Sequence, residues 1–190
     1  MNILEEITNY EPYNIQEEKD KKIILDFLER YDDAFYRSNL LAHMTASAWV
    51  VNKDRTRVLM AYHKIYDSWA WLGGHCDGDE DTLGVAIKEV KEESGIEKVK
   101  PVSENIFSLE VLSVDSHYKR GEYVPTHLHL NVTYLLEADD SEKVRVKEDE
   151  NSGVAWFDRD EAIEKSNEKW FRENIYTKLN RKLGELYEND

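Results

Sequence analysis

The sequence is poor in cysteine and proline, with one and three respectively among 190 residues. The single cysteine, Cys76, excludes an internal disulfide framework of the kind that stabilises small secreted domains. No apolar stretch approaches the ~20 residues that a helix needs to span a bilayer. The first residues, MNILEEITNYEPYN, also lack the basic start and apolar run of a secretory signal. These absences predict a cytoplasmic protein.

Basic side chains are scarce relative to acidic ones, with 25 Lys and Arg against 40 Asp and Glu and a net charge of −15. Because like charges repel, this balance predicts that neither nucleic acid nor an anionic membrane is a partner. A phosphate substrate would need cations in order to approach such a chain. The hydrophobic content of 41% is sufficient for a packed core, and the length predicts one domain with extensions.

The most informative stretch covers residues 73–96 and reads GGHCDGDEDTLGVAIKEVKEESGI. Four apolar residues in it follow the helical spacing i, i+3, i+4 and i+7, namely Leu83, Ala86, Ile87 and Val90. Asp79 and Asp81 precede this pattern and can cap a helix by accepting from its free N–H groups. Gly95 suits the left-handed position that ends a helix. The stretch therefore predicts a loop followed by a helix over residues 82–94.

Three glutamates of this helix, Glu89, Glu92 and Glu93, are spaced i, i+3 and i+4 and share one side of it. Their charges repel one another, and a hard divalent cation such as Mg²⁺ or Mn²⁺ would remove that penalty. The alternative is a solvated acidic helix face, which is common in so acidic a chain. The glycines at fixed offsets favour the cation site, because a chance match to the whole string is on the order of one in a hundred thousand.

The string resembles the Nudix box, G-x5-E-x7-R-E-U-x-E-E-x-G-U, in which U is aliphatic. Every position matches except one, where Lys88 replaces the arginine. The resemblance implies a Nudix-type pyrophosphohydrolase that uses Mg²⁺ or Mn²⁺ and cleaves a nucleoside diphosphate linked to another moiety. Water would attack phosphorus. Two alternatives are a Nudix-like module that binds a nucleotide or nucleotide sugar without cleaving it, and an isomerase of the isopentenyl diphosphate type.

The resemblance also implies roles for individual residues. It implies four metal ligands, which are Gly74 through its carbonyl, Glu89, Glu92 and Glu93. Glu80 is implied to be the partner of the basic residue at position 88. The catalytic set comprises Glu89, Glu92, Glu93 and Glu150. Glu150 lies in a charged loop where several Nudix enzymes place a base or a further metal ligand, with Glu148 and Asp149 as rivals. The choice between Glu89 and Glu150 as the proton acceptor stays open.

Histidines form a second candidate cluster. His127 and His129 are two apart in an alternating strand, so both project from one face. His117 lies upstream beside Arg120, and His75 follows the motif glycine. The candidate substrate-binding residues are His75, His117, Arg120, His127 and His129, which would contact phosphate oxygens through charge-assisted hydrogen bonds. The alternatives are structural histidines on a polar strand face and a second metal site.

Strand patterns lie on both sides of the box helix. The clearest are a hairpin formed by residues 43–51 and 57–62, an alternating strand at 124–136 and a short strand at 154–157. Residues 1–14 and 117–123 are predicted to be irregular. Helical spacing at 15–31 and 170–186 predicts a helix near each end. This α/β pattern, sharpened by the resemblance, predicts a Nudix-like α/β/α sandwich with a mixed central sheet and extra N- and C-terminal helices.

The domain prediction places an N-terminal helical extension, residues 1–40, on the core of a Nudix hydrolase domain formed by residues 41–190. The helix of this extension covers the sheet or serves a homodimer interface, and the first alternative is favoured. Trp69 and Trp71 precede the box glycines and lie on one face if extended. They brace the loop or offer a surface on which a base or sugar stacks. Both alternatives stay open.

Overall fold

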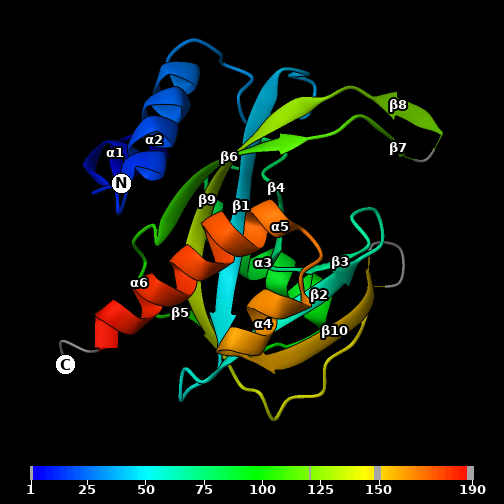
Figure 1. Cartoon of the computed structure of the whole chain (residues 1–190). Coiled ribbons are helices and arrows are strands. Elements are labelled where there is room, and N and C mark those ends of the chain that lie inside the picture. The colour runs from blue at the N-terminus through cyan, green and yellow to red at the C-terminus, as the bar shows by residue number, and fades with distance from the viewer. Residues whose placement is uncertain (1, 120, 148–150, 188–190) are drawn as a thin grey trace. The chain divides into compact units, whose positions relative to one another are not determined.

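The computed structural model describes residues 2–119, 121–147 and 151–187 (Figure 1). Its contacts divide the chain into two compact units. The first unit comprises Met1–Ser47, Gly73–Ala86 and Ser103–Tyr134, and the second comprises Ala48–Leu72, Ile87–Val102 and Leu135–Asp190. Three elements run through both units, which are β1 (Ala42–Val51), α3 (Thr82–Ser94) and β9 (His127–Ala138).

The strands form a sheet in the order β10-β2-β1-β9-β5, with β3 on β2, β4 on β1 and β6 on β9. The strands not yet bounded are β2 (Arg57–His63), β3 (Ser68–Ala70), β4 (Leu72–His75), β5 (Val99–Pro101), β6 (Ser108–Val114) and β10 (Asn151–Asp158). Helices precede and follow the strands along the chain. The predicted α/β class with a mixed sheet and terminal helices is confirmed.

In the first unit, α2 (Ile15–Leu28) packs on β6 and makes a buried polar contact with it. Glu17 of α2 is fully buried, and its carboxylate accepts from the Ser108 hydroxyl at 2.8 Å. The same carboxylate accepts from the Tyr10 hydroxyl and the Tyr13 N–H, both at 2.7 Å. Burial and the charge of Glu17 raise the pKa of Tyr10, so its phenol stays a donor. These contacts tie the predicted N-terminal helix to the sheet of its own unit.

Two predicted irregular segments in the first unit are regular. Residues 1–14 contain α1 (Ile3–Asn9), whose first turn is capped by the Asn2 side chain accepting from Glu5 N–H at 2.9 Å. Ile3 and Ile7 are buried, and this i, i+4 pair is too short a pattern to recognise in sequence. Residues 117–123 contribute to a hairpin of β7 (His117–Lys119) and β8 (Glu122–Val124), which projects beyond β6 in Figure 1.

The second unit contains the predicted hairpin of β1 and β2, in which Val50 pairs with Leu59. The Asn52 side chain closes the turn by accepting from Thr56 N–H and Arg57 N–H, both at 3.0 Å. β10 extends this sheet beside β2. The order of elements confirms the hairpin and the late strand that the alternating pattern predicted.

The C-terminal helical region of the second unit is interrupted. It comprises α4 (Arg159–Lys165), α5 (Lys169–Phe171), a π-helical turn η1 (Arg172–Tyr176) and α6 (Thr177–Tyr187). Tyr176 is buried at the π turn and stacks on Trp49 with ring centroids 5.4 Å apart. Because α5, η1 and α6 follow one another without a gap, the terminal helix predicted over residues 170–186 is confirmed, with a π turn inside it. None of the helices within residues 2–119, 121–147 and 151–187 has the length and apolarity to cross a membrane.

We expect Glu17→Ala to lower the free energy of unfolding by about 3 kcal/mol, because three donors lose their buried acceptor. The matched control is Glu18→Ala, since the Glu18 side chain is 59% exposed and pairs only with exposed Lys19 among the ion pairs of the described residues. We expect the control to change stability by less than about 0.5 kcal/mol. Urea unfolding measures both variants, and equal losses in the two would contradict the role given to Glu17.

Candidate functional site

The residues that the sequence marks as helix boundaries do cap the start and the end of α3. Asp81 caps the first turn, with its Oδ1 accepting from Gly84 N–H at 2.9 Å. Asp79 supports that cap by accepting from Asp81 N–H at 3.0 Å. Gly95 has a φ of +71° and donates its N–H to the Lys91 carbonyl at 2.8 Å. The predicted helix over residues 82–94 is therefore confirmed with both of its boundaries.

The glycine pair before the loop lies in β4, which pairs with β1. A Cβ atom on Gly73 would lie 2.6 Å from the Ala46 carbonyl oxygen, so only glycine allows this close backbone approach. Gly74 follows it in β4 and stands two residues before the buried Cys76. The Gly74 carbonyl stays a predicted metal ligand.

The three box glutamates differ in burial along α3. Glu93 is 5% exposed, and its Oε1 accepts from the Asn151 side-chain N–H at 3.4 Å. Glu89 is half-buried, and Glu92 is exposed. Glu92 lies 3.9 Å from the Lys88 ammonium and 3.5 Å from the Lys147 ammonium. A buried carboxylate beside an exposed one gives this helix a face that is partly withdrawn from water.

Asn151 shows that this face suits a hard cation. The residue is fully buried, and its Oδ1 accepts no hydrogen bond from any residue that the structure describes. An orphaned buried oxygen is costly unless a water or an ion completes it. Together with the carboxylates of α3 it supplies oxygen donors only, which is the donor set that Mg²⁺ and Mn²⁺ prefer. The residues present therefore fit a divalent cation.

Sequence reasoning missed Asn151 and Lys147, which flank the acidic triplet at 148–150. The only sequence signal was their position beside a charged loop that leads into a predicted strand. The predicted residue Glu150, with its rivals Glu148 and Asp149, lies outside the described residues, as does Arg120.

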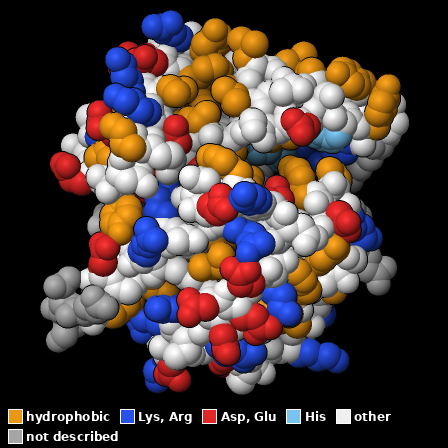
Figure 2. All heavy atoms as spheres, viewed as in Figure 1, with side chains coloured by type: hydrophobic (Ala, Val, Ile, Leu, Met, Phe, Trp, Pro, Cys, Tyr) orange, Lys and Arg blue, Asp and Glu red, His pale blue; other side chains and the backbone are white. Residues whose placement is uncertain are grey.

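Histidines from three strands gather in the first unit. The ligand nitrogens of His43, His75 and His129, from β1, β4 and β9, lie within 4.8 Å of one another. His127 stacks on His43 with ring centroids 4.9 Å apart, and His117 lies at the edge, 6.5 Å from the ring of His127. Figure 2 shows histidine surface next to basic side chains on the viewed face. His43 was missed, because a histidine at the start of a strand carries no spacing signal.

Burial changes the protonation of this cluster. Burial lowers the pKa of His75 to about 2 and that of His129 to about 3, and the neighbouring histidines add to both shifts. Burial likewise lowers the pKa of His43. All three imidazoles are therefore neutral near pH 7. This state removes the positive charge that the predicted phosphate contacts of His75 and His129 would use, and leaves them as neutral donors, acceptors or ligands.

The two tryptophans before the box glycines pack within the second unit. Trp69 meets Tyr62 and Phe157 edge-on, with ring centroids 5.5 and 4.8 Å apart. Trp71 meets Phe171 and Tyr176 at 6.1 and 5.8 Å. These contacts favour the bracing role over a stacking surface for a base or sugar.

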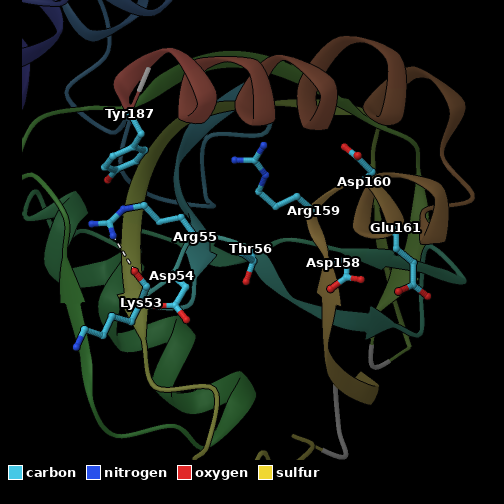
Figure 3. A pocket seen from close by; sticks show the side chains of 9 residues that line it. All are labelled: Lys53, Asp54, Arg55, Thr56, Asp158, Arg159, Asp160, Glu161 and Tyr187. Atoms are coloured by element: carbon cyan, nitrogen blue, oxygen red, sulfur yellow. Dashed lines mark hydrogen bonds between the residues drawn. The ribbon is translucent and has the colours of Figure 1, made fainter. Parts of the chain in front are cut away.

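A pocket of about 840 Å³ lies elsewhere in the second unit. Its lining residues, shown in Figure 3, are Lys53, Asp54, Arg55, Thr56, Asp158, Arg159, Asp160, Glu161 and Tyr187. Arg55 lies over the Tyr187 ring at 4.3 Å and 3.6 Å from the Glu137 carboxylate. The lining mixes charges of both signs, and the Arg55 guanidinium already has partners, so charge does not mark this pocket as a site for an anionic substrate.

The NUDIX domain model matches residues 41–179 of the chain. A C. elegans Ap4A hydrolase in a binary complex is similar in structure, with a TM-score of 0.55, 20% identity, and coverage of 77% of this chain and 98% of that chain. Another structure of C. elegans Ap4A hydrolase has a TM-score of 0.51 at 20% identity, covering 75% and 96%. A Nudix hydrolase from M. smegmatis, RenU, has a TM-score of 0.53 at 12% identity, covering 76% and 87%. No curated protein matches the sequence.

The chain therefore belongs to the Nudix family, whose members hydrolyse pyrophosphate bonds, and it is a pyrophosphohydrolase of that family.

In chelator-treated protein, we expect His129→Gln to reduce the slope of the free energy of unfolding against pH. The folded state keeps His129 neutral down to about pH 3, whereas the unfolded chain binds a proton below about 6.5. The unfolded state thus binds more protons as pH falls from 6.5, and stability is lost in that direction. Removing the group should reduce this slope by up to about 1.4 kcal/mol per pH unit.

Urea unfolding between pH 7 and 5 measures this slope. His63→Gln is the matched control, since His63 lies in β2 beside Tyr66 and outside the cluster. An unchanged slope in His129→Gln would show that burial does not hold this imidazole neutral.

Proposed function

We propose that the protein hydrolyses a diphosphate bond in a nucleoside diphosphate linked to another moiety, by attack of water on phosphorus. The observation that carries the proposal is the buried Glu93 on α3, joined to Asn151, on the same helix side as Glu89 and Glu92. Carboxylates spaced in this way are suited to bind a divalent cation. The sequence match over residues 41–179 supports the same chemistry.

The three glutamates would hold Mg²⁺ or Mn²⁺, with the Gly74 carbonyl as a further oxygen. When bound, such a cation neutralises phosphate charge and lowers the pKa of bound water. Asn151 keeps Glu93 in one orientation, which fixes the most buried ligand. Glu92 is partly neutralised by Lys88 and Lys147. Those ammonium groups reduce repulsion among the carboxylates and are positioned to attract an anionic substrate.

A carboxylate must take the proton of the attacking water, and Glu89 or Glu150 is assigned that role. Glu89 is half-buried on α3, on the same helix side as the other two box glutamates. Glu150 is assigned from the resemblance of its loop alone. A Glu89→Gln variant compared with Glu150→Gln separates the two assignments, since the proton acceptor is the one whose loss removes the pH dependence of turnover.

The substrate panel follows from the family and from the similar structures. It contains a dinucleoside polyphosphate, because an Ap4A hydrolase has a similar fold, together with a nucleotide sugar, ADP-ribose and a modified nucleoside triphosphate. Chromatographic detection of phosphate-containing products separates hydrolysis from binding without cleavage. The binding module would retain ligand and release no product.

We expect Glu93→Gln to lower turnover by at least about 100-fold with Mg²⁺, because the amide cannot replace the charge of a buried ligand. Glu97→Gln is the matched control, since Glu97 is exposed and lies just beyond α3. Product formation across the substrate panel measures both. Full wild-type turnover in Glu93→Gln, with any cleaved substrate, would remove the basis of the proposal.

We expect Asn151→Ala to weaken Mg²⁺ binding by about 10- to 100-fold, because Glu93 loses the donor that orients it. Titration of activity with Mg²⁺ should show a raised half-saturation concentration, with turnover recovering at saturating Mg²⁺. Isothermal calorimetry gives the affinity independently of turnover. A lowered turnover that added Mg²⁺ does not restore, with unchanged affinity, would contradict the orienting role of Asn151.

A further inference from the structure

We propose that His43, His75 and His129 form a second metal site, which takes a transition-metal ion of the zinc class. It differs from the glutamate site in donor chemistry, because it offers imidazole nitrogen and no carboxylate. Its three ligands come from β1, β4 and β9, and the three histidines themselves all belong to the first unit. The proposal stands on the arrangement of these side chains and is independent of whether the protein hydrolyses a diphosphate.

The separations of the nitrogens are close to those of a bound ion. All three lie within 4.8 Å of one another. A tetrahedral zinc ion with Zn–N distances of about 2.0–2.1 Å places its ligands roughly 3.4 Å apart. Small rotations of the rings suffice to close the remaining gap. Three ligands leave a fourth position for a water or a substrate oxygen, which is the pattern of catalytic rather than purely structural zinc sites.

A hydrogen bond from one ring nitrogen of His43 to a backbone carbonyl leaves the other ring nitrogen free to bind a metal. Its Nδ1 lies 3.1 Å from the Asn39 carbonyl oxygen and donates to it, so Nε2 keeps a lone pair. His43 is 4% exposed, and Nε2 has no hydrogen-bond partner among the residues that the structure describes. A buried nitrogen without a partner costs free energy. A hydrogen bond from the other ring nitrogen to a backbone carbonyl is the usual support of a metal-bound histidine.

The neighbouring histidines assign the tautomer of His129. His127 Nδ1 lies 2.8 Å from the Pro125 carbonyl and donates to it, which leaves His127 Nε2 as an acceptor. His129 Nε2 lies 3.2 Å from that nitrogen and must donate the proton between them. In that tautomer the Nδ1 atom of His129 carries a lone pair. His127 thus positions a ligand without being one.

Charge at the cluster also favours a metal cation over an anion. Burial lowers the pKa values of His43, His75 and His129, as expected for imidazoles withdrawn from water. Arg37 faces the cluster, but Asp77 neutralises it through contacts of 2.6 and 2.7 Å. Lys119 also acts on His75 and His129. Neutral imidazoles suit Zn²⁺, Cu²⁺, Ni²⁺ or Fe²⁺ and offer little to Mg²⁺.

Zinc titration of the chelator-stripped full chain tests the site. Isothermal calorimetry should show one high-affinity Zn²⁺ per chain that a large excess of Mg²⁺ does not displace. His43→Gln and His129→Gln should each weaken this uptake by at least about 100-fold, whereas the control His63→Gln should leave it unchanged. Glu93→Gln should also keep the zinc affinity, which separates this site from the glutamates.

A measurement on the unmutated protein covers the case in which a histidine variant fails to fold. Long-range ¹H–¹⁵N spectra of the imidazoles should show His43, His75 and His129 shifting with one equivalent of Zn²⁺, with His63 unmoved. Absence of stoichiometric zinc uptake, or shifts confined to other histidines, would overturn the site. So would loss of the zinc affinity in Glu93→Gln with retention in His43→Gln. Failure of the hydrolase proposal would instead appear as absent product with zinc uptake intact.

Discussion

Repulsion among the carboxylates on one side of α3 is the constraint to which the local structure responds. Glu92 is exposed between Lys88 and Lys147, and Glu93 is buried beside Asn151. Each neighbour reduces the cost of bringing negative groups together. A divalent cation, as proposed above, would reduce it further, because its charge and its preference for oxygen match the carboxylates.

The two proposed sites differ in the donor atoms that they offer to a cation. Oxygen donors lie on α3 and at Asn151, and nitrogen donors lie on β1, β4 and β9. Hard and borderline metal ions are distinguished by such donor sets more than by affinity alone. A pyrophosphohydrolase that retained a separate nitrogen site could therefore respond to transition metals without exchanging the ion at its glutamates.

Local signals explain why the box helix was predictable. Asp81, Gly95 and the apolar spacing between them lie within one short stretch, and each acts on its own neighbourhood. Signals of this kind failed where the pattern was short or interrupted. The helix at residues 3–9 has a single buried i, i+4 pair, and the π turn at residues 172–176, inside the predicted terminal helix, has no sequence signal of its own.

The sequence by itself determined the identity and spacing of the glutamates, the boundaries of α3 and the family, because these depend on residues close together in the chain. Only the tertiary structure brought Asn151 to Glu93 and His43 to His75 and His129, since strand pairing decides which distant residues meet. Burial, which also depends on the tertiary structure, decided the protonation of the histidines. It lowers the pKa of His75 and His129, an effect that depends on the surrounding protein and not on residue type.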